Sequence, residues 1–306
     1  MQRKVNQIGP STLMVSLPSK WVKINKISKG DDVEIIENGK ELRIGVNLNE
    51  EYKKIDIKVR PGNNWYTSQI VRNLYLSGYD EIKVEYDDEN VINKIQKNAR
   101  LLLGFEIIEQ KKNSCTLRNL SSGVESELDN LIRKVFLMTE SMFEMSIEQL
   151  ENNKPDLEKI IDIRNNIHRF TNLCRRIITK KQKYNIVKNT SLYNILTSIN
   201  VITHNIMYAH QYLDSKKSIP SLKPSAKYLR KVLRVFNVFH KAYYSKNVES
   251  MYDIQHSREA LINNEFVSIL EKSKGENVVL CYYFAEIARF IASIQGAALI
   301  KYHLND

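Results

Sequence analysis

Two stretches of the chain are rich in basic residues and contain no Asp or Glu. Residues 1–30 hold six basic side chains, and residues 163–188 hold eight. Basic side chains at this density attract anions, and the arginine guanidinium matches the geometry of a phosphate group. Helical spacing gathers part of the second stretch on one face, and a merely solvated basic face is the alternative there. The predicted anion or partner patch consists of Arg169, Arg175, Arg176 and Lys180.

Motifs for catalysis are missing from the sequence. We find no phosphate-binding glycine loop, no dinucleotide fingerprint, no Gly-x-Ser-x-Gly elbow and no His-Glu-x-x-His pair. The three cysteines, Cys115, Cys174 and Cys281, are far apart and odd in number, so neither a disulfide framework nor a paired-cysteine zinc site is indicated. We therefore expect a protein that is not an enzyme and that resides in a reducing cytoplasm.

The composition predicts an ordered and largely helical protein of two or three domains. The 306 residues include 42% hydrophobic side chains but only ten glycines and six prolines. The first residues lack the apolar core of a signal peptide. The most apolar stretch, residues 278–300, carries Glu286, Arg289 and Gln295. Because these groups are costly in lipid, we predict a buried bundle helix and no membrane insertion.

Residues 1–48 predict a small module that cannot close a core alone. Two short strands, Arg3–Ile8 and Thr12–Leu17, flank the turn residues Gly9-Pro10-Ser11. A helix over Ser19–Ile27 follows, and then a hairpin around Asn38-Gly39. So few residues bury little apolar surface, and small domains of this size often need a partner.

The order of these elements resembles the SpoVT/AbrB family of swapped-hairpin DNA-binding domains. The resemblance rests on Arg3-Lys4-Val5, Ile8-Gly9, Val15-Ser16-Leu17-Pro18, the lysine-rich helix and Lys29-Gly30-Asp31. The version with Ser-Leu-Pro-x-Lys-Trp-Val-Lys is similar to the form fused to PhoU-like proteins in archaea. The resemblance implies that two chains interleave their strands into one barrel that binds double-stranded DNA.

The resemblance also suggests which residues contact DNA and which close the barrel. Arg3, Lys4 and Lys23 occupy positions where the family has basic contacts, whereas its basic residue after the turn glycine is replaced here by Pro10-Ser11. A purely dimerising module is therefore the alternative. The predicted DNA contacts are Arg3, Lys4, Lys20, Lys23 and Lys26. The predicted interior of the shared barrel contains Val5, Leu13, Val15 and Ile35.

Residues 49–120 predict a small α+β connector domain. The strand pattern of residues 55–59 is followed by a helix over Ser68–Leu76, a strand over Glu81–Tyr86 and an amphipathic helix that ends before Gly104. A hairpin of Phe105–Glu109 and Ser114–Leu117 completes a βαβαββ order, which suits a sheet with helices on one face. We interpret it as a spacer, with ligand sensing as the alternative.

Residues 121–306 predict six helices. Their expected ranges are Glu125–Glu151, Asp156–Lys181, Ser191–Asp214, Ala226–Ser245, Val248–Lys272 and Glu276–His303, with a linker over Ser218–Pro224. Residues 132–136 recur in type at residues 229–233, which indicates two three-helix bundles in tandem. This layout behind an AbrB-like module resembles the PhoU family of phosphate uptake regulators. The predicted fold class is thus a multidomain α+β protein with a swapped-hairpin barrel, a connector and a PhoU-like pair of bundles.

The PhoU resemblance raises the question of a metal site. Such helices carry carboxylates at four-residue steps, which can surround a metal cluster with oxygen ligands. Arg164, Phe290 and other non-acidic residues interrupt these steps here. We therefore expect no cofactor and little bound metal in the purified protein. The remaining weak candidates for metal ligands are Asp162, His168, Asn200, His204 and Glu286.

Two functions fit these observations. The first is a cytoplasmic, homodimeric, DNA-binding transcriptional regulator linked to phosphate uptake and homeostasis. The second is a dimeric adaptor that does not bind DNA and docks on a phosphate transporter or sensor protein. Retention on DNA that depends on salt distinguishes the two.

Overall fold

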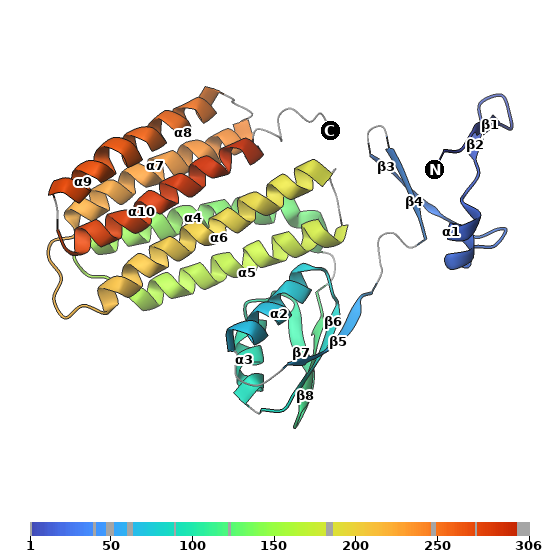
Figure 1. Ribbon diagram of the computed structural model, residues 1–306, viewed down its shortest axis with the longest axis horizontal. Coiled ribbons are helices and arrows are strands. Elements are labelled where there is room, and N and C mark those ends of the chain that lie inside the picture. The colour runs from blue at the N-terminus through green and yellow to red at the C-terminus, as the bar shows by residue number, and fades with distance from the viewer. Residues whose placement is uncertain are drawn as a thin grey trace. The chain divides into compact units, whose positions relative to one another are not determined.

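A computed structural model describes residues 2–38, 41–46, 52–59, 64–88, 90–121, 124–181, 186–245, 249–272 and 274–298 (Figure 1). The chain divides into two compact units, Met1–Glu51 and Tyr52–Asp306. The second unit includes both the predicted connector and the predicted helical region, so these two segments pack on each other.

The first unit begins with an antiparallel pair of short strands, as predicted. In β1 (Val5–Gln7) and β2 (Leu13–Val15), Val5 lies opposite Val15. The amide of Ile8 donates to the carbonyl of Thr12 at 3.0 Å and closes the turn. In the hairpin of β3 (Glu34–Asn38) and β4 (Glu41–Gly45), Asn38 lies opposite Glu41. Gly39, in the expected turn at Asn38-Gly39, lies outside the described residues.

Helix α1 (Ser19–Ile24) is shorter than the predicted Ser19–Ile27. The chain turns into the left-handed region at Lys26, where φ is 54°. The amides of Lys26 and Ile27 then donate to the carbonyls of Lys23 and Val22 at 3.3 and 3.0 Å. This pattern is a Schellman end with lysine in the position that usually holds glycine. The spacing of apolar residues does not reveal this helix end, because Ile27 still falls at a position that continues the apolar face of the helix.

The connector forms a four-stranded sheet with the predicted βαβαββ element order. Its strands are β5 (Lys54–Val59), β6 (Glu81–Tyr86), β7 (Phe105–Lys111) and β8 (Ser114–Asn119), and its helices are α2 (Asn64–Leu76) and α3 (Asn90–Ala99). The spatial order is β5-β6-β8-β7, in which only β5 and β6 are parallel. Figure 1 shows α2 and α3 side by side on one face of the sheet. Helix α2 also packs against α5 of the helical region.

The helical region follows the predicted helices with shifts at their ends. Its elements are the 3-10 turn η1 (Val124–Glu127), α4 (Leu128–Glu151), α5 (Leu157–Lys181), α6 (Ile186–Asp214), α7 (Lys223–Ser245), α8 (Glu249–Glu259), the π-helical η2 (Ala260–Phe266), α9 (Val267–Lys272) and α10 (Glu276–Ser293). Asp156, the predicted first residue of the second helix, caps α5, because its Oδ1 accepts the amide of Lys159 at 3.1 Å. Pro224 belongs to the first turn of α7 and not to the linker, since proline is tolerated there. The predicted bounds Val248 and His303 lie outside the described residues.

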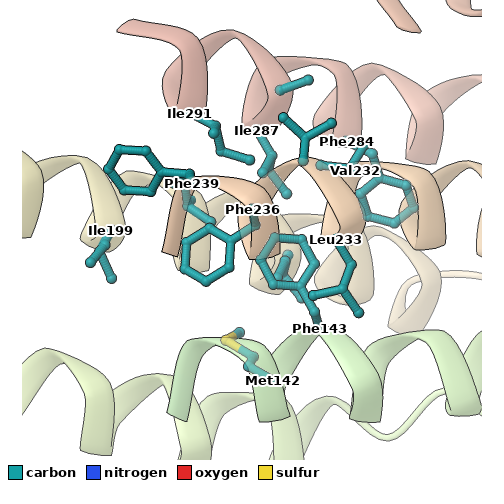
Figure 2. Packing of buried hydrophobic residues seen from close by; sticks show 14 of the residues in the cluster. Met142, Phe143, Ile199, Val232, Leu233, Phe236, Phe239, Phe284, Ile287 and Ile291 are labelled. Carbon is teal, nitrogen blue, oxygen red and sulfur yellow. The ribbon is translucent and has the colours of Figure 1, made fainter. Parts of the chain in front are cut away.

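One hydrophobic core joins all the long helices. It takes buried side chains from α4, α5, α6, α7 and α10. Figure 2 shows Phe236 and Phe239 of α7 between Met142 of α4 and Ile291 of α10. The rings of Phe143 and Phe236 lie 5.4 Å apart. Both groups of three predicted helices therefore share a single core.

Among the described residues, one helix has the length and composition to cross a membrane. It spans Glu276–Ala298 with a mean hydropathy of 1.4, and 44% of its apolar window is buried inside the structure. Leu280, Phe284 and Ile291 on this helix are fully buried in the common core. This packing agrees with the predicted bundle helix.

Candidate functional site

The five predicted DNA contacts are all exposed in the first unit. Arg3 and Lys4 directly precede β1, Lys20 and Lys23 lie on α1, and Lys26 follows it. None of the five forms an ion pair with an acid in the described part of the chain. Their charges are therefore available to an external anion.

The same unit leaves its apolar side chains uncovered. In residues 2–46, no described hydrophobic side chain is buried, and the cores begin only at Val59. Val5, Leu13, Val15 and Ile35, which we predict inside a shared barrel, are 62%, 69%, 42% and 58% exposed. So much apolar surface on a small unit marks an interaction face.

The structure engages two members of the predicted anion patch in a buried ion pair. Arg176 is 4% exposed, and its Nη2 donates to Oδ1 of Asp80 at 2.7 Å. Its Nη1 donates to the carbonyls of Tyr75 and Tyr79, each at 2.7 Å. Lys180 donates to the same carboxylate oxygen. Arg176 and Lys180 therefore bond α5 to residues of the connector. Because Arg176 is buried, it is not accessible to an external ligand.

The other two members of the patch lie elsewhere on α5. Arg175 is half-buried and donates to the hydroxyl of Tyr193 on α6 at 2.8 Å, with its guanidinium 4.3 Å from the ring centre. Arg169 is half-buried, and its buried Nε has no hydrogen-bond partner among the described residues. The structure thus separates the predicted patch into a structural pair and two further arginines.

The weak metal-ligand candidates come together only in part. His168 of α5 and His204 of α6 have ring centres 6.1 Å apart, and Nδ1 of His204 donates to the carbonyl of Asn200 at 2.7 Å. Asp162 is exposed, whereas Glu286 pairs with Arg289 on its own helix. Within the described ranges, no three His, Cys, Asp or Glu side chains are placed to hold a metal ion.

Arginines surround the two histidines instead of carboxylates. Nη2 of Arg164 contacts Nε2 of His204, and Nη1 donates to Oδ1 of Asn165 at 3.0 Å. Burial lowers the pKa of His168 to about 2, with the charges of Arg164 and Arg72 adding to the effect. Burial and the charge of Arg164 also lower the pKa of His204. Both imidazoles are therefore neutral at pH 7.

Sequence reasoning missed Arg72 and the role of Arg164. Arg72 lies on α2, and it reaches the cluster because α2 packs on α5. One signal was readable: residues 64–76, 163–181 and 186–213 contain no Asp or Glu at all. Three helices with acid-free segments that meet at one place must bring unbalanced positive charge together.

Buried neutral histidines predict a loss of stability in mild acid. Burial lowers the pKa of His210 to about 4 and that of His168 to about 2, whereas an unfolded histidine has a pKa of about 6.5. The unfolded chain therefore takes up protons first as the pH falls below that value. We expect each histidine to lower the free energy of unfolding by about 2 kcal/mol between pH 6.5 and 5.

Urea unfolding at both pH values measures this effect. The variant His168→Gln should lose less stability on acidification than the wild type, because one titrating group is gone. Equal or greater stability at pH 5 would contradict the assignment.

Comparison with known proteins identifies the N-terminal part. The family model for the antidote-toxin recognition protein MazE, a bacterial antitoxin, matches residues 7–54. The N-terminal segment is therefore similar to a MazE/AbrB-type domain, and a mixed α+β and mostly helical part follows it. No curated protein and no solved structure matched the chain.

Proposed function

We propose that the protein is a cytoplasmic, DNA-binding transcriptional regulator that dimerises through residues 1–48. The observation that carries the proposal is the match to residues 7–54 over a unit that exposes both basic and apolar side chains. A second copy of the unit would cover the apolar residues, and the dimer would then present two sets of Arg3, Lys4, Lys20, Lys23 and Lys26 to a duplex. Basic side chains of this kind contact mainly phosphates, and Arg3 is best suited to read a base edge.

The proposal assigns sensing to the rest of the chain. We infer a connector over residues 49–120 and a PhoU-like domain over residues 121–306 that links the regulator to phosphate homeostasis. The resemblance of the helical layout supports this link. A phosphate transporter or sensor protein is the proposed partner of the helical domain.

A dimeric adaptor is the second candidate. The turn Pro10-Ser11 lacks the basic residue that the AbrB resemblance leads one to expect, which favours this alternative. In that case, residues 1–48 serve only to dimerise, and the chain docks on a protein. A mobility shift of duplex DNA at low salt tests the choice, since an adaptor gives no shift with any duplex.

Removing residues 1–48 should produce monomers. The remaining chain keeps its own cores, centred on residues such as Ile82 and Phe236, whereas the deleted unit contains the uncovered apolar face. The expected result is a halved mass by light scattering with an unchanged helical circular dichroism signal. If the shortened chain still had the mass of a dimer, the dimer interface would have to lie in the helical region.

A further inference from the structure

Three acid-free helical segments meet where α2 and α6 each pack against α5. Arg72 of α2, Arg164 and Arg175 of α5 and two histidines gather there. All three arginines are half-buried, and none of them forms an ion pair with a described acid. Cations that are partly removed from water without a counter-charge are unfavourable. A counter-charge from outside the chain would relieve this cost.

Hydrogen bonds hold the arginines without neutralising them. A backbone carbonyl can only accept, so the bond from His204 to Asn200 places the proton of His204 on Nδ1. Nε2 of His204 is then an acceptor for Nη2 of Arg164. Arg72 donates to Oε1 of Gln69, and Arg175 donates to the hydroxyl of Tyr193. Every partner is neutral, so the three positive charges persist.

Several buried polar atoms in the cluster have no partner. His168 is 6% exposed, and neither of its ring nitrogens has a hydrogen bond within the described chain. The buried Nε atoms of Arg72, Arg164 and Arg175 also have none. Native proteins satisfy most buried polar atoms, so each exception needs an explanation. A ligand with several acceptor oxygens would explain Arg72, Arg164 and His168 together.

The electrostatic effects connect the arginines through Arg72. Arg175 lowers the pKa of Arg72, and Arg72 lowers the pKa of Arg164, in each case after burial as the larger cause. The charged groups that act on His168 are Arg164, Arg72 and Arg175, all of them cationic. The cluster therefore carries unbalanced positive charge inside the connector–bundle contact.

The geometry points to a binding site for a phosphate group formed by Arg72, Arg164 and His168, with His204 positioning Arg164. Arg175 lies about three helical turns from Arg164 on α5 and adds positive charge next to Arg72. Two guanidiniums match the charge and the number of oxygen atoms of a phosphate group better than they match a single carboxylate. Neutral His168 offers one donor and one acceptor nitrogen, and a protonated phosphate can both accept and donate. Bound phosphate would contact Arg72 of α2 and Arg164 of α5 and would thereby stabilise the packing of these two helices. The regulatory consequence rests on the proposed function, whereas the binding itself does not.

Calorimetric titration of the full chain with inorganic phosphate tests the site. The protein is first transferred to a phosphate-free buffer, and DNA is left out, so a failure here does not bear on DNA binding. We expect saturable binding that is weakened at least tenfold in Arg164→Gln and in Arg72→Gln. Arg100→Gln removes the same charge from an exposed residue after α3 and should bind like the wild type.

Thermal unfolding separates a binding role from a structural one. Without phosphate, Arg72→Gln should be at least as stable as the wild type, because the change removes like-charge repulsion. Phosphate should raise the melting temperature of the wild type but not that of this variant. Pyrophosphate that bound more tightly through the same arginines would also support the site and would indicate a longer phosphate chain as the ligand.

Three results would overturn the inference. The first is the absence of saturable binding to the wild type. The second is an equal loss of binding in Arg100→Gln. The third is the same rise in melting temperature with sodium chloride at matched ionic strength, which would reduce the effect to screening.

Discussion

Replacing Arg176 by methionine should lower the free energy of unfolding by about 3–5 kcal/mol, the range typical of breaking a buried ion pair. The side chains of Arg176 and Asp80 are only 5% and 3% exposed. The change leaves the Asp80 carboxylate buried with Lys180 as its remaining side-chain partner. It also removes the donors to the carbonyls of Tyr75 and Tyr79. Stacking of the guanidinium 4.9 Å from the ring centre of Tyr75 disappears as well.

Lys180→Met provides the matched control. It removes a charge from the same carboxylate, but the Lys180 side chain is 23% exposed and Arg176 remains in place. We expect a loss of about 1 kcal/mol, near the upper end for exposed pairs. The double variant Arg176→Met with Asp80→Leu should be more stable than Arg176→Met alone, because the buried carboxylate of Asp80 is then also removed. Urea unfolding measures all three, and a loss below about 1 kcal/mol for Arg176→Met would show that the pair does not hold the connector.

The triple variant Arg3→Ala, Lys4→Ala and Lys23→Ala should abolish retention of duplex DNA. In a dimer the change removes six positive charges from the proposed interface, and phosphate contacts supply most of the affinity of such proteins. All three side chains are exposed, so the fold and the dimer should be unchanged. A mobility shift at low salt, together with a light-scattering mass, gives both readings.

A second triple variant controls for the loss of charge. Lys97, Arg100 and Lys112 are exposed on the connector and offer the same residue types. Their replacement by alanine should leave DNA retention close to that of the wild type. If both triple variants lost retention equally, the binding would be due to net charge. If neither did, the N-terminal unit would be a dimeriser and the adaptor function would be favoured.

Local patterns predicted most of the elements. The alternation of Ile55, Ile57 and Val59 predicted β5, and the capping residue Asp156 marked the start of α5 correctly. Such signals are local, because a strand or a helix end depends on a few neighbouring residues. The N-terminal domain was recognisable for a related reason, since its motifs follow one another within a short segment.

Long-range pairs were not predictable in the same way. Asp80 and Arg176 are separated by 96 positions, and nothing in either neighbourhood indicates the other. Arg72 joins Arg164 only because α2 packs on α5. Helical spacing shows which residues share a face but not what covers that face, so the sequence did not reveal that Arg176 and Lys180 of the predicted anion patch contact Asp80.

The π-helical turn η2 shows a different limit. The pattern predicted one helix over Val248–Lys272, whereas the described residues form α8, η2 and α9. A π turn adds about one residue per turn and rotates the apolar face slightly. Leu261 and Phe266 remain buried across it, so the hydrophobic spacing still looks helical.

The salt dependence of DNA binding tests the central proposal most directly. Six basic residues per chain in residues 1–30 give up to twelve phosphate contacts in a dimer, and we expect about half of them to engage. Fluorescence anisotropy of a labelled duplex, measured with the full chain over a series of potassium chloride concentrations, gives the affinity at each point. We predict a slope of log affinity against log salt of about −5. No binding at low salt, or a slope near zero, would contradict the proposal that this protein acts on DNA.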